Sequence, residues 1–137
     1  MNARAGMGVL LASIIAALVA CTSPTTSVNE LPVTVDLAVG NRVSLVDRGI
    51  TLRFDGVVTD NRCPMGALCI VAGQAVLSFS LTGPNAPVSG RLLLASDRPD
   101  STLGVVLSVE TVTPYPQIGQ PQPDHRADRV KLRISAR

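Results

Sequence analysis

From about residue 31 to the C-terminus, apolar and polar side chains alternate with a period of two. The alternation is clear over 33–39, 50–58, 75–82, 105–110 and 130–135, with Gly, Pro and Asp between these segments. One apolar and one polar face on each strand is what an antiparallel sheet with one solvated side requires. No segment after residue 21 carries a helical stripe of useful length. The sequence therefore predicts an all-β domain: an antiparallel β-sandwich, Ig-like or related, of about seven or eight short strands, with a small barrel as second choice.

One position inside this pattern allows two interpretations. The dipeptide Asp55-Gly56 has the composition of a two-residue hairpin turn. Because the alternation continues through Gly56 to Val58, we favour a single strand with Gly56 at a bulge or a close approach.

The first 21 residues have a different character from the rest of the chain. Arg4 and the terminal amine precede fourteen uncharged residues, from Met7 to Ala20. As a helix these would span about 21 Å, which is short of the roughly 30 Å hydrocarbon core of a bilayer. The length therefore favours the apolar region of a signal peptide over a retained transmembrane helix.

This segment ends in Leu18-Val19-Ala20-Cys21, which resembles the lipobox of bacterial lipoproteins. The resemblance implies transfer of diacylglycerol to the Cys21 thiol, cleavage between Ala20 and Cys21, and fatty acylation such as palmitate on the new amine. An ordinary secretory signal with a chance cysteine is the alternative. Thr22 is not the Asp that holds lipoproteins in an inner membrane. We therefore expect the outer membrane in a diderm bacterium, and otherwise the outer face of the cytoplasmic membrane.

The sequence then divides into three parts. Residues 1–20 are the expected lipoprotein signal peptide. Residues 21–31 are the lipidated cysteine and a tether, which we expect to be flexible because it is polar and short of large apolar groups. Residues 32–137 are the expected β-sandwich domain.

The two remaining cysteines, Cys63 and Cys69, lie between two predicted strands. An exported protein meets an oxidising environment, so we predict a disulfide that closes a small loop. A redox-active pair is usually Cys-x-x-Cys at the start of a helix, which this spacing does not match. Two cysteines and the distant His125 are an incomplete set of metal ligands.

The segment around these cysteines, Asp60–Pro64 followed by Cys69–Gly73, resembles a family of uncharacterised bacterial lipoproteins. That family has the pattern Asp-Ser-Arg-Cys-Pro, a short gap, and Cys-x-Trp-Ala-Gly. Here Asn61 replaces Ser, and Val71 stands where the family has Trp. The resemblance implies an envelope lipoprotein with a small β domain, and it implies no particular activity.

Four residues make up the candidate binding surface: Asp60, Arg62, Pro64 and Tyr115. Arg62 has the chemistry of a bidentate anion site shaped by Asp60. We favour instead a structural pair, in which Asp60 accepts from loop amides and from Arg62. Tyr115, between two prolines, either anchors a partner or covers one end of the sandwich. The expected surface is thus the Cys63–Cys69 loop together with the Tyr115 loop.

The composition excludes several classes of function. The formal net charge is +2 and only three residues are aromatic, which argues against nucleic-acid binding. His125, beside Asp124, is the only histidine base, and no Gly-x-Ser-x-Gly elbow accompanies it. We therefore expect no catalytic residue, no metal and no cofactor.

A basic row, Arg129, Lys131 and Arg133, falls on the polar face of the last predicted strand. It suits either contact with anionic lipid headgroups or a charged sheet edge that discourages aggregation. We favour the charged edge, because three charges add only about 3 kcal/mol of attraction to lipid.

These observations together favour a monomeric, non-enzymatic, lipid-anchored protein of the cell envelope, acting as an accessory or binding module. It would be anchored to the membrane through lipid on Cys21 and would bind an envelope protein partner. The alternative is a small Ig-like inhibitor or ligand-binding protein that presents the same two loops. A distant third interpretation is a hydrolase that uses His125.

Overall fold

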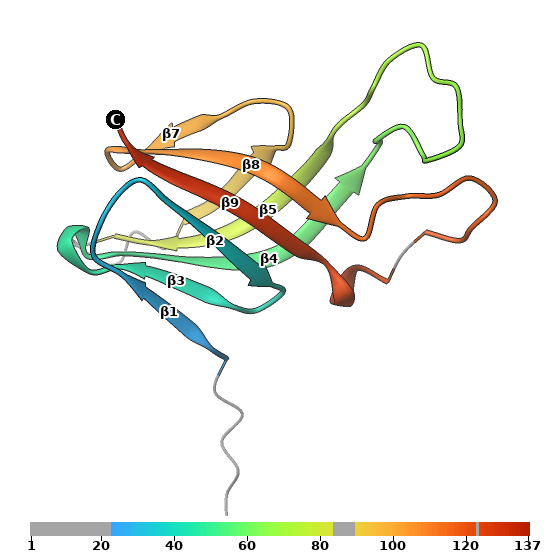
Figure 1. The fold of residues 1–137 in the computed structure, drawn as a ribbon. Coiled ribbons are helices and arrows are strands. Elements are labelled where there is room, and N and C mark those ends of the chain that lie inside the picture. The colour runs from blue at the N-terminus through green and yellow to red at the C-terminus, as the bar shows by residue number, and fades with distance from the viewer. Residues whose placement is uncertain (1–22, 84–89, 123) are drawn as a thin grey trace, which may run out of the picture.

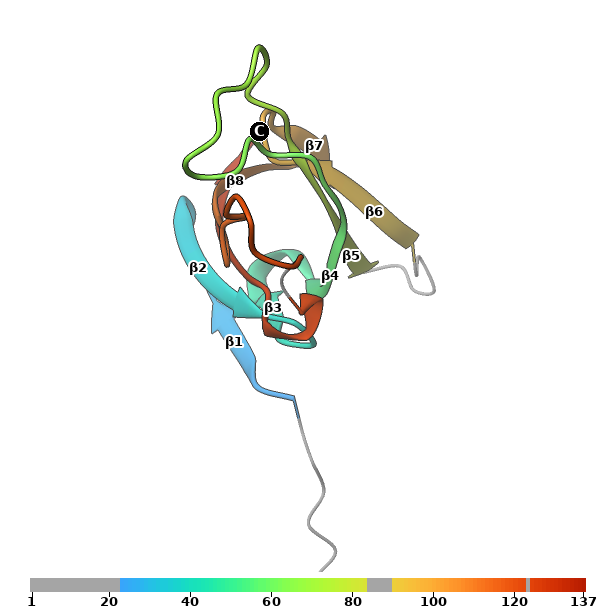
Figure 2. The ribbon, with the colours of Figure 1, turned by 90° about the vertical axis from the view of Figure 1, so that its right-hand side faces the viewer.

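Two β-sheets pack face to face in the computed structural model, which describes residues 23–83, 90–122 and 124–137 (Figures 1 and 2). The five-stranded sheet has the order β1 (Thr25–Val28), β3 (Arg42–Leu45), β4 (Ile50–Asp60), β5 (Ala75–Thr82) and β6 (Gly90–Ala95). The four-stranded sheet has the order β2 (Val33–Ala38), β9 (Arg129–Ala136), β8 (Val105–Thr113) and β7 (Asp100–Thr102). The only helical turns in the described part are η1 (Val46–Arg48) and η2 (His125–Ala127). The predicted β-sandwich is confirmed, and the sheets do not close into the barrel that was the second choice.

The segment expected to be a flexible tether contains a strand, so that prediction is wrong for residues 25–28. There β1 pairs in parallel with β3, from Thr25 opposite Arg42 to Val28 opposite Leu45. Thr and Val favour strands, and the free edge of β3 offers unpaired backbone groups to them. Every other strand pair is antiparallel within the described residues.

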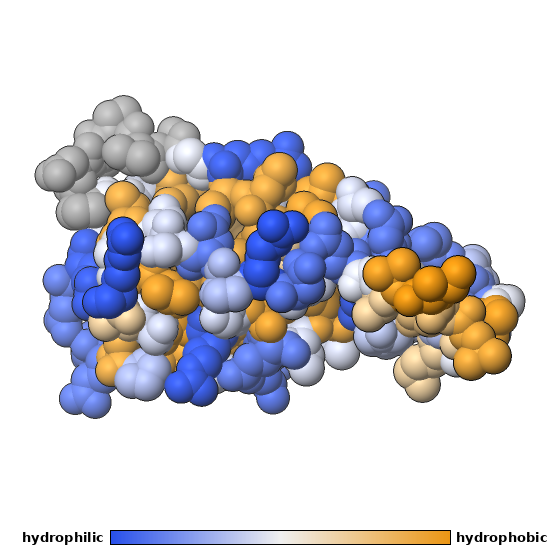
Figure 3. Space-filling model, turned by 90° about the horizontal axis from the view of Figure 1, so that it is seen from above, coloured by the Kyte–Doolittle hydropathy of each residue, from blue (hydrophilic) through white to orange (hydrophobic). Residues whose placement is uncertain are grey.

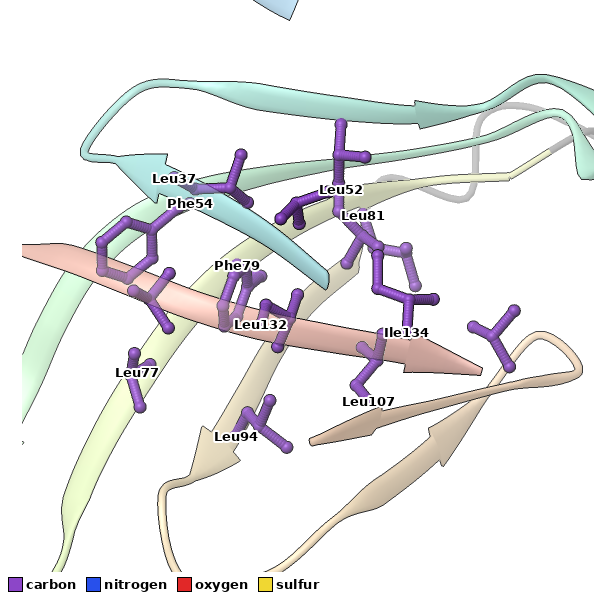
Figure 4. Close-up of a cluster of buried hydrophobic side chains, with 14 of the residues drawn as sticks. Leu37, Leu52, Phe54, Leu77, Phe79, Leu81, Leu94, Leu107, Leu132 and Ile134 are labelled. Carbon is purple, nitrogen blue, oxygen red and sulfur yellow. The ribbon is translucent and has the colours of Figure 1, made fainter. Parts of the chain in front are cut away.

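The apolar positions of the alternating segments point between the sheets and form one core (Figure 4). In β9 the burial alternates strictly from Arg129 to Ile134, with the charged residues outside. At the centre, the rings of Phe54 and Phe79 lie 5.3 Å apart, and these residues are cross-strand partners on β4 and β5. Both rings are fully buried, so the two phenylalanines serve packing.

Gly56 lies at a bulge, as the alternation indicated. The pairing of β4 with β5 shifts register between Phe54 and Gly56, and Gly56 has φ 127°. A side chain is strained at that angle, and the glycine lets one strand bend there and continue to Asp60.

The basic row is exposed, but it does not lie at a sheet edge, which corrects the favoured interpretation. β9 is an interior strand, between β2 and β8. Lys131 stands opposite Asp36 of β2, and the Arg129 guanidinium lies 2.9 Å from the carboxylate of the same Asp36. The row is therefore partly neutralised by its neighbour strand.

Strand directions bring several connections to one end of the sandwich, on the right in Figure 1. β4 ends there and β5 begins there, and β8 and β9 meet there in the same way. Because β1 runs parallel to β3 and hence opposite to β4, the start of β1 also faces this end. The proposed signal peptide, Ala20 and Cys21 lie outside the described residues. Within the described ranges, the structure contains no helix with the length and apolar character needed to cross a membrane.

Candidate functional site: two braced loops

Two loops project from this end of the sandwich (Figures 1 and 2). The cysteine loop, residues 61–74, joins β4 to β5. The proline loop, residues 114–122, follows β8. We refer to the two together as the loop tip. It contains Pro64 and Tyr115, and Asp60 and Arg62 lie at its base.

The predicted disulfide between Cys63 and Cys69 is confirmed. Their Cα atoms lie 6.0 Å apart, an ordinary separation for a disulfide. Inside the ring that it closes, the Ala67 amide donates to the Pro64 carbonyl at 3.0 Å. A short turn is thus tied twice, by a covalent bond and by a backbone hydrogen bond.

The base of the cysteine loop continues the pairing of the strands that carry it. The Asn61 amide donates to the Gln74 carbonyl at 2.9 Å, and the Cys63 amide donates to the Ala72 carbonyl at 2.8 Å. Gly73 sits between these bonds with φ 71°, and a Cβ there would lie 1.8 Å from the Asn61 carbonyl oxygen. Only glycine fits this close approach of two backbones.

Backbone hydrogen bonds also join the two loops. The Met65 amide donates to the Pro116 carbonyl at 2.9 Å, and the Ile118 amide donates to the Met65 carbonyl at 3.2 Å. Gly66 lies against Ile118, where an added Cβ would come within 3.1 Å of the isoleucine side chain. The loop tip is therefore one connected unit.

Asp60 and Arg62 hold this unit to both sheets. Arg62 Nε donates to Asp60 Oδ1 at 2.8 Å and Nη2 donates to Oδ2 at 2.6 Å, a bidentate pair. The same guanidinium donates to the carbonyls of Val112 at 2.6 Å and of Pro114 at 3.0 Å. Only 9% of the Arg62 side chain and 4% of the Asp60 side chain are exposed. The pair thus connects the end of β4 in one sheet to the end of β8 in the other.

The electrostatics of this pair fit a structural role. Burial acts to raise the pKa of Asp60, but the hydrogen bonds and the positive charge of Arg62 outweigh it, so the pKa of that carboxyl lies below its usual value. Four hydrogen bonds occupy the guanidinium, and the Asp60 carboxylate already neutralises it. This geometry does not offer Arg62 as an open anion site.

Tyr115 has the covering role, which is one of the two that the sequence allows. The Arg62 guanidinium carbon lies 4.5 Å from the centre of the Tyr115 ring, in a cation–π contact. The ring covers the buried ion pair, and 42% of the residue remains exposed. A shallow hollow of about 270 Å³ adjoins it, bordered by Val109, Val112 and Ser96.

The outer surface of the loop tip is apolar, which the sequence reasoning missed. In Figure 3 hydrophobic side chains gather at the end of the molecule where the loops project. The exposed residues there are Met65, Leu68, Ile70, Val71 and Ile118. Leu68 and Ile70 are as exposed as in an extended peptide, at 105% each. The available signal was the lack of any charged residue over 63–83 and over 114–122.

His125 has a different partner from the one adjacent to it in sequence. Its Nδ1 lies 3.0 Å from Oδ2 of the buried Asp128, which also accepts from the Val57 amide at 3.3 Å. Asp124 instead accepts from the Arg126 amide at the start of η2. Burial raises the pKa of Asp128, although the His125 and Val57 contacts oppose it. Among the described residues, the His125 ring has Asp128 as its hydrogen-bond partner, not a serine or cysteine.

Metal binding finds no support in the described part of the chain, where no three His, Cys, Asp or Glu side chains come together. Comparison with models of protein families, with curated proteins and with solved structures found no match. The motif at 60–73 therefore remains a resemblance, and function rests on the geometry of the loop tip.

Proposed function

We propose that this protein is a lipid-anchored, non-enzymatic binding module of the bacterial cell envelope, and that the loop tip is its binding surface. The observation that carries the proposal is the combination of bracing and apolar exposure at one end of the sandwich. Soluble proteins seldom expose several large apolar side chains together unless the patch binds something.

The bracing matters because binding by a loose loop must first order it. A disulfide, the bonds between the loops and the Asp60–Arg62 pair already hold the tip in one arrangement. Such preorganisation lowers the entropic cost of association. Rigid scaffolds with functional loops at one end are a common design for binding proteins.

The lipid anchor is the second part of the proposal. The lipobox at Leu18–Cys21 supports acylation of Cys21, with the outer membrane as the address in a diderm bacterium and the outer face of the cytoplasmic membrane otherwise. Two or more acyl chains on one residue anchor a protein stably, where a single chain does not.

Expression of the full chain in a bacterium supplied with a clickable fatty acid tests the anchor. The wild type should incorporate the label and partition into the detergent phase, and Cys21→Ser should do neither. A Cys63→Ser/Cys69→Ser variant is the control, because it keeps the proposed lipidation site and loses the other two thiols. A Cys21→Ser chain that still carries label would refute the lipoprotein assignment.

A further inference from the structure

The large apolar side chains of the loop tip are exposed to solvent, and the hollows beside them, one next to Tyr115 and one along the proline loop, are shallow and open. Leu68, Ile70 and Val71 follow one another at the outer end of the cysteine loop, with exposures of 105, 105 and 78%. Ile118, 62% exposed, adds a fourth side chain from the proline loop. Projecting side chains of this kind suit a soft apolar phase, into which each can be buried separately.

We infer that the loop tip inserts these side chains into the lipid surface of the membrane that carries the protein. The inference deepens the proposed function and rests on it for the choice of membrane. The ligand class is neutral phospholipid, because neither loop carries a charged residue between 63 and 73 or between 114 and 122. Arg62, the cation at the base, is already paired with Asp60 and makes no separate contribution to headgroup binding.

The direction of β1 makes the chain enter the sandwich from the side that faces the tip, although Thr25 itself lies partway along the sheet. Thr25 pairs with Arg42, which pairs with Arg53 of β4, and β4 then continues to Asp60 at the base of the tip. Three residues lie between Cys21 and Thr25, so the two Cα atoms can be at most about 14 Å apart. The remainder of β4 places the base of the tip about 23 Å past the level of Thr25, and the cysteine loop extends further. An inclined sandwich therefore lets the anchor and the tip meet one bilayer plane.

Backbone chemistry limits the depth of insertion. Hydrocarbon does not tolerate unpaired amides and carbonyls, so the loop backbone must stay among the headgroups while the side chains enter the acyl region. The bonds at Cys63, Met65 and Ile118 already pair part of this backbone. The half-exposed Tyr115 ring is suited to the same interface, since it has an apolar face and a hydroxyl.

Tyr115 provides a direct probe, because it is the only tyrosine and the chain has no tryptophan. The first measurement reconstitutes the processed, acylated protein into phosphatidylcholine vesicles with or without bromine on the acyl chains. Bromolipid should quench Tyr115 emission in the wild type and quench it much less in Leu68→Ser/Ile70→Ser. The matched control is Val46→Ser/Leu93→Ser, which removes two residues exposed to 55 and 53% elsewhere and should behave as the wild type.

The second measurement removes the anchor. Residues 22–137 contain every described strand and the whole core, and their flotation with the same neutral vesicles should depend on the tip. Leu68→Ser/Ile70→Ser should lower the partition coefficient by about tenfold or more. Both substituted side chains are fully exposed, so the variant should unfold at the same urea concentration as the wild type.

The outcomes separate this inference from the proposed function. An acylated protein whose Tyr115 is not quenched overturns the inference and leaves the anchor intact. A chain that is not acylated, but whose residues 22–137 bind vesicles through the tip, refutes the lipoprotein assignment and supports the inference. Equal vesicle binding by wild type and Leu68→Ser/Ile70→Ser, or a tip that binds a purified envelope protein and no vesicle, also overturns it.

Discussion

Replacing Arg62 by Met tests whether the ion pair at the base of the loop tip is a brace. Methionine keeps the length of the apolar stem and removes the guanidinium, so the carboxylate of Asp60, only 4% exposed, loses its bidentate partner. The carbonyls of Val112 and Pro114 lose their donors at the same time. Removal of one member of a buried pair costs about 3–5 kcal/mol. We expect the free energy of unfolding at pH 7 to fall by that amount.

The assay is urea unfolding followed by far-ultraviolet circular dichroism, because the chain has no tryptophan to report by fluorescence. The double variant Asp60→Asn/Arg62→Met should recover part of the loss, since it leaves no buried charge without a partner. Asp60→Asn alone should be destabilising, because it removes the charge that the guanidinium pairs with. The three variants with the wild type complete a double-mutant cycle.

The pH dependence of the free energy of unfolding is an independent test of the Asp60–Arg62 pair. The pKa of Asp60 is lower in the folded protein than its ordinary value of 3.8, so the pair stabilises the fold fully above that value. This contribution is lost as the pH falls from about 4 through the folded pKa. The difference between wild type and Arg62→Met should therefore shrink at acid pH. If Arg62→Met lowers the free energy of unfolding at pH 7 by less than about 1 kcal/mol, as is typical for an exposed pair, the ion pair does not brace the loop tip.

Three further predictions concern the same end of the molecule. Gly73→Ala should lower the free energy of unfolding by more than about 1 kcal/mol, the usual difference between glycine and alanine inside a strand, because the new Cβ would lie 1.8 Å from a carbonyl oxygen. The midpoint of urea unfolding measures this loss, and an unchanged midpoint would contradict the close approach. Cys63→Ser/Cys69→Ser should cost about 2–2.5 kcal/mol, from the entropy of a seven-residue loop in the unfolded chain, and calorimetry of oxidised and reduced wild type should agree with it. The pKa of Asp128 is raised in the folded protein, so ionisation of this carboxyl destabilises the fold as the pH rises through the folded pKa. The free energy of unfolding should therefore fall less between pH 4 and neutrality in Asp128→Asn than in the wild type. Identical pH profiles would contradict the burial of that charge.

The regular part of the fold could be predicted from alternation alone. Leu52, Phe54 and Leu132 are buried because a period of two puts them on the apolar face, whichever strands become their neighbours. The edge strand β1 could not be predicted in this way. Its four residues make a strand only because β3 offers a free edge beside them, which depends on the order of strands in the folded sheet.

The site shows the same division between local and long-range information. The Cys63–Cys69 bridge and the turn contact between Asp60 and Arg62 are local, and the sequence indicated both. The hydrogen bond from Arg62 to the Val112 carbonyl joins the loop after β4 to a strand of the other sheet, 50 positions away, and no local sequence pattern predicts it. Leu68 and Ile70 would be assigned to a core by hydropathy, since residues of this type are mostly buried. They are exposed because they lie in a loop that projects from the end of the sandwich, which hydropathy alone does not indicate.

The edge position of β1 also has a mechanical consequence. A pull on the chain from Cys21 loads β1 first, because Thr25 is where the chain joins the sandwich. Three of the four residues in β1 are exposed, and the fourth, Val28, is only partly buried against the core. Detaching residues 25–32 would release a segment with a contour length of about 27 Å and leave the other eight strands in place. Under tension, β1 would therefore detach from β3 and release its residues before the rest of the domain unfolds.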